Sequence, residues 1–155
     1  MNRLFIYTEL LWWAITAVVM AAILWPIYYS GIQWPFLVTN ILFIVLLITL
    51  SRHIFLLQYS LIGKNQLFKA IVFIALFPIT FALISELNKF LIFADEQRME
   101  ILTHMLPYEQ QRPLETYIWR QMVFFGIGSI IAAPVLAGRL FMSVWKQYNN
   151  RKDEL

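Results

Sequence analysis

The sequence predicts an all-α membrane protein: an antiparallel bundle of four transmembrane helices with a short amphipathic helix in an outer loop. Hydrophobic residues make up 61% of the 155 residues and charged residues 14%, whereas soluble domains have about 45–50% and 25%. The apolar residues fall into four stretches, each with about the 20 residues that a helix needs to cross a hydrocarbon core of about 30 Å. A backbone in lipid must satisfy its own hydrogen bonds, so each stretch is expected to be helical. The expected spans cover about residues 10–29, 36–57, 67–85 and 122–145.

The first two spans are expected to form an antiparallel hairpin. Pro26 and the segment 31–35 supply the helix breakers of a short turn between them. The first span lacks a short apolar core followed by a small-residue cleavage site, so we interpret it as a retained anchor and not a signal peptide. No linker or internal repeat divides the sequence, and residues 1–155 are expected to form a single domain.

The third span is followed by an outer loop, about residues 86–121, the only sizeable segment outside the expected spans. Within it, Asp95 is a candidate N-cap for a short helix that Pro107 ends. The apolar face of this helix consists of Met99, Leu102, Met105 and Leu106. Such an amphipathic helix either lies on the membrane and caps the bundle, or is a docking helix for a partner protein.

The fourth span is expected to belong to a longer helix. Pro113 suits the first position of a helix, and a helix from there to about Tyr148 would be roughly 50 Å long. That length exceeds the thickness of the bilayer core, so the helix is expected to project outward and brace the outer loop. Pro78 in the third span and Pro134 in the fourth are expected to bend their helices.

Small residues are concentrated in the fourth span, and they predict close helix packing. Because lipid tails are as apolar as leucine, helices in a membrane associate largely where small side chains let backbones approach. A matching set, Ala14, Ala17, Ala21 and Ala22, lies on the first span. Either spans one and four pack together within the chain, or the face forms an oligomeric or heteromeric interface. The candidate packing residues of the fourth span are Gly128, Ser129, Ala132, Ala133 and Ala137.

Charged residues are scarce within the spans and lie near their ends. Glu9 and Arg139 are expected at similar depths on the first and fourth spans, so an intramembrane ion pair between them is one candidate. Alternatively, Arg139 reaches the headgroups with its long side chain, or has a substrate or proton role. No carboxylate falls at mid-membrane, which argues against a proton- or sodium-coupled transporter.

No motif in the sequence points to catalysis, a cofactor or a metal. Cysteine is absent, which excludes disulfides and thiolate chemistry. His53 and His104 are expected on opposite sides of the membrane and so cannot share a ligand within one chain. The segment 152–155 matches an ER-retrieval signal, which we interpret as a coincidence because the tail is expected in the cytoplasm.

The distribution of Lys and Arg predicts the orientation. With both termini in the cytoplasm, eight of these residues lie on the inner side and four on the outer side, as the positive-inside rule favours. The net charge of +3 is therefore interpreted as a topology signal and not as a nucleic-acid footprint. A bacterial inner (plasma) membrane is the expected location.

These observations favour a small non-enzymatic accessory or scaffold subunit of a larger membrane assembly. Its expected partners are membrane lipids and either other membrane subunits or further copies of itself. The alternative is a small oligomeric channel or carrier for an ion or apolar solute. Its candidate lining residues are Thr16, Thr39, Asn40, Thr49, Thr80 and Ser129. A lipid-directed enzyme is third and rests only on interfacial groups such as His104 and Glu109.

Overall fold

The computed structural model describes residues 3–57, 66–96 and 98–152. These residues form α1 (Arg3–Tyr29), α2 (Leu37–Leu56), α4 (Gln66–Asp95), α5 (Arg98–Thr103) and α6 (Tyr108–Lys152), and they include no strand. The four longer helices, α1, α2, α4 and α6, are each long and apolar enough to cross a membrane. The expected all-α fold with four spanning helices is confirmed, and the chain is an integral membrane protein.

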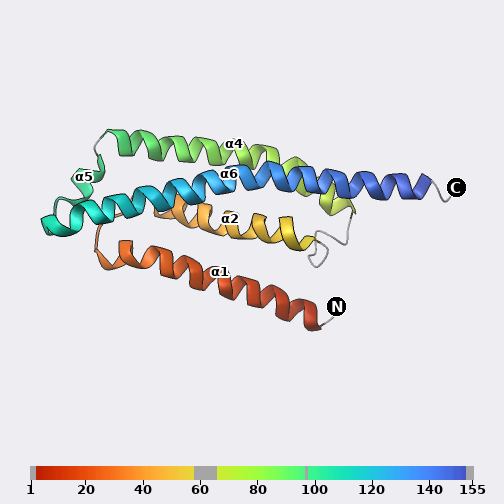
Figure 1. The fold of residues 1–155 in the computed structure, drawn as a ribbon, viewed down its shortest axis with the longest axis horizontal. Coiled ribbons are helices and arrows are strands. Elements are labelled where there is room, and N and C mark those ends of the chain that lie inside the picture. Colours follow the sequence, from red (N-terminus) through yellow and green to blue (C-terminus); the bar gives the residue numbers. More distant parts are fainter. Residues whose placement is uncertain (1–2, 58–65, 97, 153–155) are drawn as a thin grey trace.

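Helix α6 is the centre of the bundle. It lies between α4 and α2 and packs along both, whereas α1 lies at the edge and makes fewer contacts (Figure 1). Helix α1 begins and α6 ends at the same end of the bundle, which we call the inner end; α5 lies at the opposite, outer end (Figure 1). Both ends of the chain therefore emerge on one side, as an even number of spans requires.

The core has an aromatic outer part and an aliphatic inner part. In the outer part, Trp34 and Phe36 each meet Phe90 edge to face, with ring centroids 6.2 and 5.8 Å apart, an arrangement that aromatic rings prefer. In the inner part, leucines from α2 and α4 pack against the small residues of α6. This inner cluster contains Leu50, Leu57, Leu76, Ala132, Ala133, Leu136, Ala137 and Leu140.

The expected hairpin of the first two spans is present. Helix α1 passes through Pro26 and ends at Tyr29. The chain then turns at Gly31, whose φ of 72° lies in the left-handed region that glycine adopts without a steric penalty. The N–H of Gly31 donates to the carbonyl of Tyr28 at 3.2 Å and closes the turn. Pro26 therefore does not end the helix; the glycine does.

Helix α4 is longer than the third expected span. It runs from Gln66 to Asp95. Asp95 was a candidate N-cap for the following helix, but it is instead the last residue of α4. Residues 86–95 contain no glycine or proline, and Leu83, Leu87 and Phe90 continue one buried face past the apolar stretch. Burial of that face against the bundle carries the helix ten residues further.

Helix α6 also begins earlier than expected, at Tyr108 and not at Pro113. Its first turn is closed by the N–H of Gln110, which donates to the Pro107 carbonyl, and by the Gln111 amide, which donates to the Leu106 carbonyl, both at 2.8 Å. The helix spans 45 residues, roughly 65 Å at 1.5 Å per residue. The expectation of a long, outward-projecting last helix is confirmed, and most of the expected outer loop is helical.

Residues 58–65, between the second and third spans, lie outside the described residues. So do three of the four residues of the segment that matches an ER-retrieval signal (153–155).

Candidate functional site

A buried ion pair joins α1 to α2 near the inner end. Arg52 Nη1 donates to Glu9 Oε2 at 2.8 Å and Arg52 Nη2 donates to Glu9 Oε1 at 2.5 Å. The Arg52 side chain is 8% exposed and that of Glu9 24%. A bidentate guanidinium–carboxylate contact is directional as well as strong. It therefore fixes both the distance and the rotation of α1 relative to α2 near the inner end.

The ion pair lies in a small pocket of about 290 Å³ between α1 and α2. The guanidinium carbon of Arg52 stands 5.6 Å from the centre of the Trp12 ring, within range of a cation–π contact. His53 also lines the pocket, but its Nδ1 donates to the Thr49 carbonyl of its own helix at 2.6 Å. Each charged group here has a partner within the protein, so the arrangement suits a structural joint better than a binding site.

The structure pairs Glu9 with Arg52, and not with Arg139, which was one of the candidates from the sequence. The Arg139 side chain is exposed on α6. The inner half of α6 packs on α2 and α4, and the inner core cluster contains no residue of α1. Consecutive helices joined by a short turn are usually neighbours, and this rule, applied to the hairpin, would have selected Arg52.

At the outer end, α1 is joined to α6. Tyr117 Oη donates to the main-chain carbonyl of Ile23 at 2.7 Å, and Ile27 is buried in the outer core cluster. Neither contact was predicted from the sequence, because no motif links Tyr117 to a residue 94 positions earlier in the chain. Helix α1 is therefore connected to the rest of the bundle by a polar contact near each end.

The small-residue face of α6 packs against α2 and α4. Ser129, Ala132, Ala133 and Ala137 are buried. Ser129 Oγ lies 2.9 Å from the carbonyl of Phe43 on α2. A Cβ at Gly128 would stand 3.0 Å from Leu47, also on α2. The expectation that this face packs on the first span is therefore wrong, because the face packs on α2 and α4 instead.

The alanines of α1 face away from the bundle. Ala14, Ala17, Ala21 and Ala22 are all exposed, although they are the set that was expected to meet the fourth span. The buried face of α1 is instead the one that carries Thr16 and Ile27. Helix α1 thus presents a small-residue surface to its surroundings with no partner among the described residues.

Helix α5 caps the outer end of the bundle. Met99 is buried in the outer core cluster, and Leu102 packs against it. The buried hydroxyl of Thr103 donates to Glu115 on α6 and fixes the end of the short helix. Of the expected docking face, Leu106 is half-buried and only Met105 is freely exposed, at 84%. Most of that face is used within the chain.

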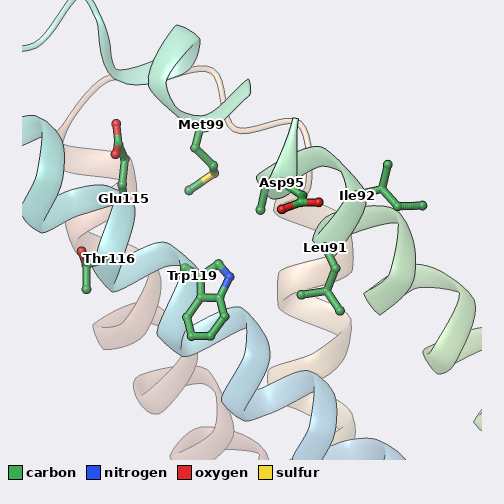
Figure 2. Close-up of a pocket in the computed structure, with 8 residues that line it drawn as sticks. Leu91, Ile92, Asp95, Met99, Glu115, Thr116 and Trp119 are labelled. Carbon is green, nitrogen blue, oxygen red and sulfur yellow. The ribbon is translucent and has the colours of Figure 1, made fainter. Parts of the chain in front are cut away.

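A pocket of about 620 Å³ opens between α4, α5 and α6 at the outer end. Figure 2 shows Asp95 from α4, Met99 from α5 and Trp119 from α6 around this space, with Glu115 at its far side. Its walls are largely apolar and its polar groups are mainly carboxylates. No group of three or more metal-ligating side chains occurs in the part of the chain that the structure describes.

Comparison with family models, curated proteins and solved structures found no match to this chain. The function is therefore argued from the arrangement of these surfaces.

Proposed function

We propose that this chain is a non-enzymatic accessory or scaffold subunit of a larger membrane assembly, and that α1 is the helix that contacts the partner. The observation that carries the proposal is the outward small-residue face of α1. Ala14, Ala17 and Ala21 are exposed, and at 100° per residue they lie within an arc of about 60°. A surface of this kind lets the backbone of another helix approach closely in lipid.

The way α1 is attached supports this role. Its span is the least buried of the four. Of its 18-residue apolar stretch, 11% is buried, compared with 39% of the corresponding stretch of α6. The Glu9–Arg52 pair near the inner end and the Tyr117–Ile23 hydrogen bond near the outer end hold it in place. Both contacts use the inward face of α1, so a partner can bind the outward face without displacing them.

The shape of the outward face also suits a crossing helix. The alanines lie in the middle of the span, while Leu10 and Leu11 flank them toward the inner end and Trp25 toward the outer end, all exposed. Ala14, Ala17 and Ala21, with exposed Val18 beside them, form a shallow saddle between these bulky side chains. A saddle of this kind can accommodate one helix crossing at mid-membrane.

The orientation belongs to the same proposal. We place both termini in the cytoplasm of a bacterial inner membrane, with α5 on the opposite side, because Lys and Arg are concentrated at the inner end. Cysteine accessibility checks the orientation, since the natural chain has no cysteine. A cysteine in place of exposed Met105 should react with a membrane-impermeant reagent added from outside intact cells.

The partner is sought by crosslinking and mild-detergent purification from native membranes. A single cysteine at Ala17 should crosslink to a membrane protein that also co-purifies in stoichiometric amount. Ala17→Leu and Ala21→Leu fill the saddle and should reduce the recovered partner at least about 10-fold. Ala82→Leu makes the same change at an exposed position of α4 and serves as the matched control. Recovery of the tagged chain alone after crosslinking would refute the proposal.

The channel or carrier alternative has less support. Thr16, Thr80 and Ser129, three of its candidate lining residues, donate to main-chain carbonyls at 2.7–2.9 Å, as hydroxyls in membrane helices commonly do. Thr39 donates to Glu86 at 3.0 Å. Proteoliposomes with flux above that of empty vesicles would favour the alternative over the subunit role.

A further inference from the structure

A groove of about 810 Å³ runs along the outer part of α6. Its lining follows two adjacent rows of residues at four-residue spacing on this helix, which together form a stripe that winds part of the way around it. Arg112 and Arg120 belong to the first row, and Gln121 belongs to the second. Tyr117, also in the second row, has its hydroxyl occupied by the carbonyl of Ile23. The groove shares Thr116 with the outer pocket of Figure 2, and its other lining residues are different. None of its lining residues belongs to α1.

The floor of the groove contains an unpaired amide. The Gln121 side chain lines the groove, the residue is only 7% exposed, and neither Nε2 nor Oε1 has a hydrogen-bond partner among the described residues. A buried amide without partners is destabilising. Both amide atoms are covered in this conformation, and a rotation of the side chain toward the groove would bring a donor and an acceptor to a bound ligand.

The rim of the groove is cationic. Arg112 and Arg120 are exposed, and neither forms an ion pair with a described residue. The lining residues include no carboxylate, so the charge of the two guanidinium groups is not neutralised within the groove. Guanidinium groups bind phosphate oxygens with paired, directional hydrogen bonds.

The other end of the groove is apolar. Phe124 is 66% exposed and Phe125 is half-buried, and both lie one turn further along α6 toward the membrane interior. Polar groups thus lie where lipid headgroups are expected and aromatic rings lie where acyl chains begin. A ligand that satisfies both ends has an anionic head and a hydrocarbon tail.

We propose that this groove binds a net-anionic phospholipid from the leaflet at the outer end. Arg112 and Arg120 donate to the phosphate oxygens, the Gln121 amide donates to a headgroup or ester oxygen, and one acyl chain lies over Phe124. A zwitterionic lipid is disfavoured because its ammonium group would lie beside two guanidinium groups. The site does not depend on the subunit role proposed above, since all of these residues belong to α6.

Native mass spectrometry of the purified full-length chain tests the site. The protein is incubated with equimolar phosphatidylglycerol and phosphatidylcholine with identical acyl chains. We expect retained phosphatidylglycerol to exceed phosphatidylcholine at least about 10-fold, and Arg112→Gln with Arg120→Gln to bring the ratio near one. Arg98→Gln removes one outer charge that already pairs with Glu96 and should leave the preference intact. Equal retention of both lipids by the natural chain would overturn the proposal.

Two further measurements separate this site from a misfolded protein and from a soluble-anion site. Gln121→Leu removes the unpaired amide, so it should lower lipid retention about 3-fold while leaving the Tm unchanged or higher. Unchanged lipid retention in this variant would remove Gln121 from the site and contradict the proposal. An excess of inorganic phosphate should leave the lipid bound, because it cannot replace the acyl-chain contacts. Displacement by phosphate would show a soluble-anion site and would likewise overturn the assignment.

Discussion

Arg52 on α2 binds both carboxylate oxygens of Glu9 on α1, at 2.8 and 2.5 Å. This contact connects the least buried span to the rest of the bundle at the inner end, and Trp12 lies against the same guanidinium. Apolar side chains in a membrane gain little by moving from lipid to a helix interface, so polar contacts of this kind help to determine the position of a peripheral helix. The ion pair is thus a determinant of how α1 is held in the bundle.

The ion pair should contribute measurably to the stability of the bundle. Arg52→Met leaves the Glu9 carboxylate unpaired in a largely buried place, and it should lower the free energy of unfolding by about 1–3 kcal/mol. The double variant Glu9→Leu with Arg52→Met should recover most of that loss, because no uncompensated charge remains. Unfolding in mixed detergent micelles measures all three proteins. Additive losses in the double variant would show that the two side chains are not coupled.

The Tyr117 hydroxyl contributes a polar contact to the outer attachment of α1, beside the apolar packing of Ile27. Tyr117→Phe removes the hydrogen bond to the Ile23 carbonyl and should lower the free energy of unfolding by about 0.5–1.5 kcal/mol. Tyr29→Phe makes the same change at an exposed residue and should have no measurable effect. If the two variants unfold alike, the Tyr117 hydroxyl has no role in holding α1.

Two glycines of α6 should respond to alanine in opposite directions. A Cβ at Gly126 would lie 2.8 Å from Leu87 Cδ1 and 3.2 Å from Phe43, whereas a Cβ at Gly138 would meet nothing within 4 Å. Gly126→Ala should therefore cost about 1–3 kcal/mol through overpacking. Gly138→Ala should stabilise the helix by about 0.5–1 kcal/mol, since alanine has the higher helix propensity. The Tm values of both variants check this, and a stabilised Gly126→Ala protein would contradict the close packing.

The position of α5 should depend on its contact with α6. Thr103→Val keeps the buried shape but removes the hydroxyl that donates to Glu115, which should loosen α5 without unfolding the bundle. Limited trypsin digestion reports this as faster cleavage after Arg98, an exposed residue at the start of α5. Met105→Ala changes a freely exposed residue two positions after Thr103 and should leave the cleavage rate unchanged. Equal rates for the two variants would argue against the Thr103–Glu115 contact.

The sequence was sufficient for the spans and the hairpin because these depend on local properties. A run of apolar residues of the right length must be helical in lipid, and Gly31 lies in the short turn that was expected between the first two helices. Helix ends were less predictable. The extension of α4 to Asp95 rests on contacts of Leu87 and Phe90 with the bundle, and these contacts are not visible in the chain itself.

The composition and apolar stretches of this chain by themselves determined an all-α membrane protein with four spans and a long last helix. Only the tertiary structure decided that Glu9 pairs with Arg52, that the small face of α6 packs on α2 and α4, and that the alanines of α1 face outward. The reason is physical. A soluble helix marks its buried side by an apolar stripe, but a spanning helix is apolar on all sides, so its neighbours are selected by shape and by a few polar contacts between distant residues.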